Sequence, residues 1–204
     1  YPAAWTSLER ALVAADQGSF LAKLSGRRDA PRLELRKAQE DLAMAWLRDV
    51  RVPEGKTFAD VVDPLLVVIT RGSIDAEGVR EADLLAHLGW AYFLKSRDRG
   101  TDIDPALSYE KALAIDPDNP YANAFWGHWI VWQRGSIDEA NRHFAAALAG
   151  GREHDFVRRL QLAALRNYTA PEVEGALLRA VDEMRRNDEV VDEATRRYVF
   201  GIYF

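Results

Sequence analysis

Apolar residues recur along this chain at the spacing of α-helices, and strand-like alternation is nearly absent. Leu8, Leu12 and Ala15 place an apolar stripe on a first helix that runs from about Ala3 to near Gly18. Pro64 lies within a third apolar segment, so that segment predicts either a kinked helix or one that starts at the proline.

Turn and capping residues divide the rest of the pattern. Asp29 is expected to cap a second helix with Pro31 in its first turn, and the third helix, from about Phe58, is expected to end at Gly72. Thr169 and Glu172 have the spacing of a capping box. The later predicted helices cover 79–96, 105–115, 121–134, 137–149, 154–166, 171–186 and 190–204. About ten helices with short connections result, which predicts an all-α fold.

Two segments in the middle of the chain align on each other. The first contains Leu88-Gly89, Tyr92, Tyr109, Ala112-Leu113 and Pro117, and the second contains Trp126-Gly127, Ala140, Phe144 and Ala147-Leu148. The offset is 38 residues from Gly89 to Gly127 and 35 from Ala112 to Ala147. A period of about 34 residues is typical of tetratricopeptide repeats.

On these residues the stretch from Ala82 to Gly151 resembles the tetratricopeptide repeat family. In that family small residues at the Gly89 and Ala112 positions allow two antiparallel helices to approach closely, and aromatic residues fill the space between helices. The resemblance implies an α-solenoid of stacked antiparallel helix pairs, a right-handed superhelix. Its domains would be divergent N-terminal helices at 1–78, two repeats at 79–151 and further repeat-like helices at 152–204. Departures from the family pattern are Pro105, Trp126, a Gly127 one residue too far from the following turn, and Arg152.

The same resemblance implies a concave groove lined by the first helix of each pair. The groove residues would be Asp83, Ala86, Trp90, Phe93, Phe125, His128, Trp129 and Trp132. Aromatic residues on several faces of one helix are usually core, but a two-layer stack cannot easily bury them all. We therefore expect Trp129 or Trp132 to be exposed, as an anchor for a partner. Ala86 and Trp90 replace the lysine and asparagine with which some family members hold a C-terminal carboxylate, so mainly apolar contacts are expected.

Composition and charge narrow the function further. The chain has 204 residues, 48% of them hydrophobic, with a formal net charge of −5 and no cysteine. An acidic balance argues against nucleic-acid binding. The paired arginines at 27–28, 158–159, 185–186 and 196–197 lie near acids, which is typical of solvated helix faces. No apolar run reaches the roughly 18 residues of a membrane span. Tyr1 is not an initiator methionine, so we expect a processed form or fragment, and the compartment stays open between cytoplasmic, periplasmic and anchored.

Residue patterns that would carry catalysis or hold a metal were sought as well. The four histidines lie on different predicted helices without ligand spacing, and His87 has the setting of a packing residue. A partial calcium-loop pattern from Asp116 has Gly127 where a glutamate is needed. No phosphate-binding glycine loop or nucleophile elbow is present. The sequence thus predicts a non-enzymatic adaptor without metal or cofactor that binds a protein or peptide. Two alternatives are a self-assembly module and a helper domain of a larger enzyme or membrane-anchored protein.

Overall fold

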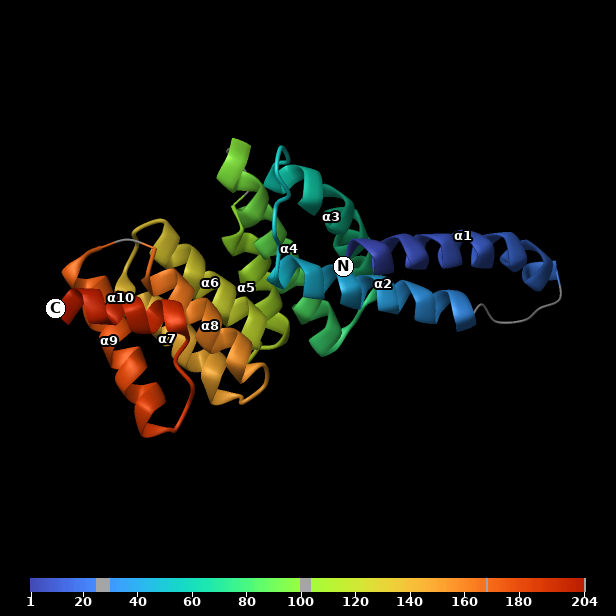
Figure 1. The fold of residues 1–204 in the computed structure, drawn as a ribbon. Coiled ribbons are helices and arrows are strands. Elements are labelled where there is room, and N and C mark those ends of the chain that lie inside the picture. The colour runs from blue at the N-terminus through green and yellow to red at the C-terminus, as the bar shows by residue number, and fades with distance from the viewer. Residues whose placement is uncertain (25–29, 100–103, 168, 204) are drawn as a thin grey trace. The chain divides into compact units, whose positions relative to one another are not determined.

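The structure, a computed structural model, describes residues 1–24, 30–99, 104–167 and 169–203. The described residues form ten α-helices and no strand, which confirms the all-α fold (Figure 1). The chain divides into two compact units, Tyr1–Pro105 and Ala106–Phe204. The domain boundaries drawn after residues 78 and 151 follow sequence motifs and stay predictions.

The first unit is built from four helices. They are α1 (Pro2–Leu24), α2 (Ala30–Arg48), α3 (Phe58–Asp75) and α4 (Gly78–Arg99). Helices α1 and α2 lie side by side, and α2, α3 and α4 pack on one another (Figure 1). Their shared core consists of small and branched apolar side chains, among them Ala43, Leu47, Val62, Leu65, Ile69, Ala82, Leu84 and Ala91.

Helix α1 does not end near Gly18 as predicted but continues to Leu24. A glycine inside a helix costs only about 1 kcal/mol relative to alanine, so it does not end a helix on its own. Pro31 lies in the first turn of α2, as expected. The predicted capping residue Asp29 lies outside the described residues.

Helix α3 begins at Phe58 and passes through Pro64, and Thr57 and Asp60 form a capping box at its start. The predicted end at Gly72 is wrong, because the helix continues to Asp75. Gly72 serves close packing instead: a Cβ atom there would lie 2.8 Å from the carboxylate carbon of Glu40 on α2. The glycine thus makes room for a buried glutamate, whose Oε2 is 2.5 Å from the Arg80 guanidinium.

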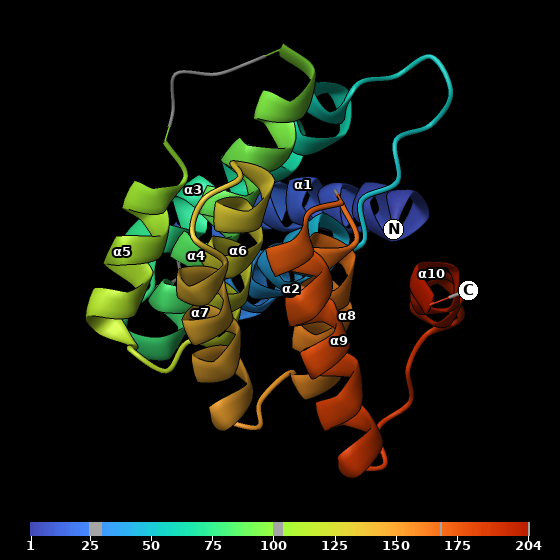
Figure 2. The ribbon, with the colours of Figure 1, turned by 90° about the vertical axis from the view of Figure 1, so that its left-hand side faces the viewer.

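The second unit contains six helices, all within three residues of their predicted ends. They are α5 (Ala106–Ile115), α6 (Pro120–Trp132), α7 (Ile137–Ala149), α8 (His154–Leu165), α9 (Pro171–Arg186) and α10 (Glu193–Tyr203). Helix α6 packs against α5, α7 and α8, while α9 lies beside α8 (Figure 2). The core of the unit is apolar and includes Ile130, Val131, Phe144, Leu162, Leu165, Leu177, Val181, Met184 and Val199.

Two caps in this unit show how its helices start. Asn119 is fully buried, and its side-chain oxygen accepts a hydrogen bond from the Ala122 amide at 2.9 Å, so it caps α6. The capping box predicted at Thr169 and Glu172 is wrong. Ala170 is the N-cap of α9, and its side chain makes no capping hydrogen bond. Pro171 holds the first helical position and favours an extended residue before it, which places Ala170 at the boundary.

Helices α6 and α7 lie close together at Gly127. A Cβ atom on this glycine would lie 3.1 Å from the Ala140 carbonyl oxygen and 3.2 Å from the Phe144 ring. Ala140 and Phe144 are both fully buried. A small residue is therefore required where the two helices meet, as in the helix pairs of the family that the sequence resembles.

Candidate functional site

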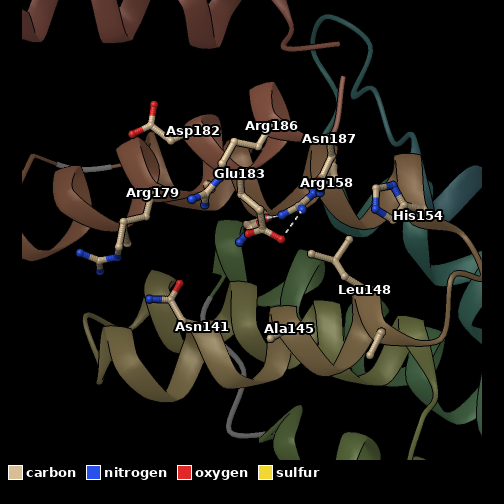
Figure 3. A pocket seen from close by; sticks show the side chains of 14 residues that line it. Asn141, Ala145, Leu148, His154, Arg158, Arg179, Asp182, Glu183, Arg186 and Asn187 are labelled. Atoms are coloured by element: carbon tan, nitrogen blue, oxygen red, sulfur yellow. Dashed lines mark hydrogen bonds and ion pairs between the residues drawn. The ribbon is translucent and has the colours of Figure 1, made fainter. Parts of the chain in front are cut away.

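The second unit has an open groove of about 840 Å³ between α7 and α9. Asn141, Ala145 and Leu148 line its α7 side, and residues of α8 close it at the base. In Figure 3, Arg179 and Asn141 mark one end, Glu183 and Arg158 the middle, and His154 the other end. The full lining is Asn141, Ala145, Leu148, Ala149, His154, Arg158, Gln161, Ala176, Arg179, Ala180, Asp182, Glu183, Arg186 and Asn187.

A buried arginine holds the base of the groove in place. Arg158 is only 3% exposed, and its guanidinium donates to Glu183 at 2.9 Å and to Glu189 at 3.0 Å. A third hydrogen bond reaches the Gln161 side-chain oxygen at 3.0 Å. Arg158 thus joins α8 to α9 and to the turn that follows α9. A buried charge with several partners of this kind is costly to disrupt from one side.

These contacts shift the pKa values of Arg158 and Glu189. Burial alone would lower the pKa of Arg158, but hydrogen bonds to Glu183 and Glu189 outweigh it and raise the pKa. Burial would raise the pKa of Glu189, yet its hydrogen bonds with Arg158 and Asn187 lower it. Arg158 and Glu189 are therefore both ionised near neutral pH, and the Arg158 guanidinium is engaged inside the protein.

Two arginines of α9 lie at the surface of the groove, unlike the buried Arg158 of α8. Arg179 and Arg186 are exposed side chains of the groove lining. Among the residues that the structure describes, neither has a carboxylate within ion-pair distance. Asp182 points away from α7, and its carboxylate lies 3.9 Å from Arg185 (Figure 3). The groove therefore carries unneutralised positive charge in a chain whose formal net charge is −5.

Small side chains keep the groove wide between the charged residues. Ala145 and Ala149 are exposed on α7, whereas Ala176 and Ala180 on the facing side of α9 are buried. Leu148 adds a half-buried apolar side chain. This lining leaves room for a chain segment and offers it apolar contact along the α7 wall.

A second hollow of about 490 Å³ adjoins the groove through Arg179. It lies between the turn at residues 134–138 and the start of α9, and it has Asp138 and Glu172 in its lining. Arg134 lines the hollow as well, so acidic and basic side chains are mixed there.

The groove predicted from the sequence draws four residues from each unit. In the first unit Ala86, Trp90 and Phe93 are buried, and Asp83 is half-buried. The Trp90 indole N–H donates to the Leu47 carbonyl at 2.9 Å, and its ring lies 4.9 Å from the Phe93 ring. The hydrogen bond joins α4 to α2. The three buried side chains pack the protein interior and present no surface to a partner in this structure.

In the second unit Phe125 and His128 are buried, and Phe125 packs 5.7 Å from the Phe156 ring. Trp129 is half-buried against the core, whereas Trp132 is 42% exposed. One of the two tryptophans expected at the surface therefore lies there. Partner binding by the eight predicted residues stays a prediction.

Other candidate groups take part in packing. His87 is fully buried, with Nδ1 2.6 Å from the Asp83 carbonyl oxygen and Nε2 3.3 Å from the Arg48 guanidinium. Burial lowers the pKa of His87 to about 3, so the ring is neutral. His143 hydrogen-bonds Asn123 at 3.0 Å and stacks on Trp126. Over the described ranges, no three His, Asp or Glu side chains are grouped as a metal site.

The sequence analysis missed the arginines of the groove. It placed Arg158 on a solvated face, which is wrong, because Leu162 and Leu165 follow at helical spacing and put Arg158 on the apolar face of α8. That spacing was the available signal. Arg186 is exposed as predicted, but nothing local shows that it and Arg179 face another helix.

Comparison with known proteins gives no relative. No protein-family model, no curated protein and no solved structure matches the chain. None of the helices, over the residues described, is both long and apolar enough to cross a membrane.

Proposed function

We propose that this chain is a non-enzymatic interaction module of tetratricopeptide-like helix pairs, whose groove between α7 and α9 holds a segment of a partner protein. The open groove is the observation that carries the proposal. Protein ligands bind where concave surface combines apolar contact with a few polar groups, and the alanines, Leu148 and the arginines supply that combination.

The arrangement of helices supports the repeat interpretation. Helices α6 and α7 form a close pair around Gly127, and α6 also packs on α8, the first helix of the next pair. Helix pairs that stack on each other bury one face and leave another open for a ligand. The solenoid and the family assignment remain part of the proposal.

The chemistry of the perturbed groups supports a binding role over catalysis. His87 is held between a carbonyl and Arg48 with no exposed surface, and Arg158 is bound by two glutamates. Neither faces a substrate-sized opening with its reactive atoms unengaged. Both are therefore best explained as packing elements.

Self-assembly is a second candidate, supported by exposed apolar side chains near α10. Val190 is 89% exposed and Phe200 is 63% exposed. Light scattering over a range of concentrations tests this candidate, since a monomer at high concentration would eliminate it.

Selection from a random peptide display library tests the groove. Ala145→Trp fills the space beside α7 with a bulky ring at an exposed position, so it is expected to weaken the selected peptides by about tenfold or more. Ala194→Trp, at an exposed alanine of α10 outside the groove, is the matched control and is expected to have no effect. Failure to enrich peptides, or equal binding by Ala145→Trp, would refute the proposed function.

A further inference from the structure

We propose that the segment held between α7 and α9 is acidic, with two carboxylates spaced to reach Arg179 and Arg186. This inference rests on the groove function proposed above and adds the chemical class of the ligand. It follows from the charge of the groove, from the spacing of the two arginines and from the lining between them.

Charge complementarity is the first argument. Arg158 is neutralised by Glu183 and Glu189, so the arginine charge that the protein leaves unmatched in the groove belongs to Arg179 and Arg186. The neighbouring Arg185, Arg196 and Arg197 all have carboxylate partners on their own helices. The lining as a whole holds three arginines against two acids, Asp182 and Glu183, so it carries an excess of positive charge on an acidic protein and favours negative charge at Arg179 and Arg186.

Spacing sets the pattern of the ligand. Arg179 and Arg186 are seven positions apart on α9, or about 10 Å along its axis. A helical ligand matches this distance with acids seven residues apart, and an extended ligand matches it with acids three residues apart, at about 3.3 Å per residue. The guanidinium fork of each arginine suits a carboxylate, which it binds through two hydrogen bonds.

The lining favours a peptide over a nucleic acid. Ala145, Ala149 and Leu148 give apolar contact, and Asn141 offers an amide that can bond to a peptide backbone. Among the described residues of the lining there is no phenylalanine, tyrosine or tryptophan for base stacking, which single-stranded nucleic acids use for affinity. Two arginines also neutralise too few phosphates for strong binding at physiological salt.

The hollow beyond Arg179 is mixed in charge. Asp138 and Glu172 line it together with Arg134. The proposed match between carboxylates of the ligand and arginines of the protein is therefore confined to Arg179 and Arg186.

Two synthetic probes test the ligand class. One is a fluorescein-labelled 14-residue peptide of alanine and leucine with glutamate at its fourth, seventh and eleventh positions, and the other has glutamine there. The glutamate peptide is expected to bind about tenfold more tightly by fluorescence polarisation in low salt, and less so as salt is added. Arg179→Gln and Arg186→Gln should each weaken it about fivefold and leave the glutamine peptide unchanged.

Arg185→Gln is the matched control, since Arg185 lies on α9 next to Arg186 but outside the groove lining. Equal binding of the two peptides, no binding of either, or the same loss in the control would overturn the acidic ligand. Tighter binding of a labelled thymidine oligonucleotide than of the glutamate peptide would do so as well. If the display library enriches neutral or basic peptides that Ala145→Trp weakens, the inference fails while the groove function stands. If nothing is enriched, the function itself fails.

Discussion

Replacement of Gly127 by alanine would test how closely α6 and α7 must approach. Gly127 lies inside α6, where alanine is the better helix former by about 1 kcal/mol. Taken alone, this preference makes the variant more stable than the natural protein. The tertiary contact acts in the opposite direction.

The added Cβ atom would lie 3.1 Å from the Ala140 carbonyl oxygen and 3.2 Å from the Phe144 ring. The oxygen belongs to the backbone of α7, and Phe144 is fully buried, so neither neighbour can move without displacing packed atoms. Overpacking of this kind costs about 1–3 kcal/mol. The net expectation is a loss of about 1 kcal/mol in the free energy of unfolding.

Urea unfolding followed by tryptophan fluorescence and circular dichroism would measure this change. Gly201→Ala is the control, because Gly201 is also helical and a Cβ atom there meets nothing within 4 Å. The control is expected to be unchanged or more stable by up to about 1 kcal/mol. A Gly127→Ala protein as stable as the control would refute the argument that close helix packing excludes a larger residue.

Three further predictions concern single side chains. Arg158→Ala is expected to reduce the free energy of unfolding by about 3 kcal/mol in urea titrations, because it takes the guanidinium from the half-buried Glu189, which keeps its contacts with Asn187 and His154. A loss near zero would contradict the role of the network. His87 has a pKa of about 3 when folded and near 6.5 when unfolded, so the unfolded chain binds the proton first. The contribution of His87 to the free energy of unfolding should be constant above pH 6.5 and fall by up to about 1.4 kcal/mol per pH unit below it. The stability of His87→Gln should therefore fall less steeply over this range. Trp132→Ala should lower stability less than Trp129→Ala, since Trp132 is 42% exposed and Trp129 packs on the core; thermal unfolding that ranks them the other way would show this reasoning to be wrong.

The helices could be predicted from the sequence because their signals are local. Asn119 and Pro120 are adjacent in the sequence, and in the structure Asn119 is the N-cap of α6 and Pro120 its first residue. Gly18 and Gly72 were wrongly predicted to end their helices. Gly72 is needed for close packing against Glu40, and Gly18 lies in a helix that continues to Leu24. A glycine in the sequence therefore does not by itself mark the end of a helix.

The candidate groove could not be predicted in the same way. Arg158 meets its partners across 25 and 31 residues, so the ion-pair network exists only after α8 and α9 have packed. Arg179 and Arg186 face α7 only because of how α9 is turned about its own axis when it packs. The sequence does not show this orientation. The aromatic residues of α6 gave a clear sequence signal, but Phe125 is used for packing.

The ion-pair network of Arg158 has a consequence for the rate and the entropy of binding at the proposed groove. Because Arg158 ties Glu183 on α9 to α8, the wall that carries the exposed arginines is held in place without a ligand. Such preorganisation spares an incoming chain the entropic penalty of ordering its receptor, so that penalty falls on the ligand alone. Encounters should therefore proceed without a slow rearrangement, and differences in affinity among ligands should appear mainly in how quickly they dissociate.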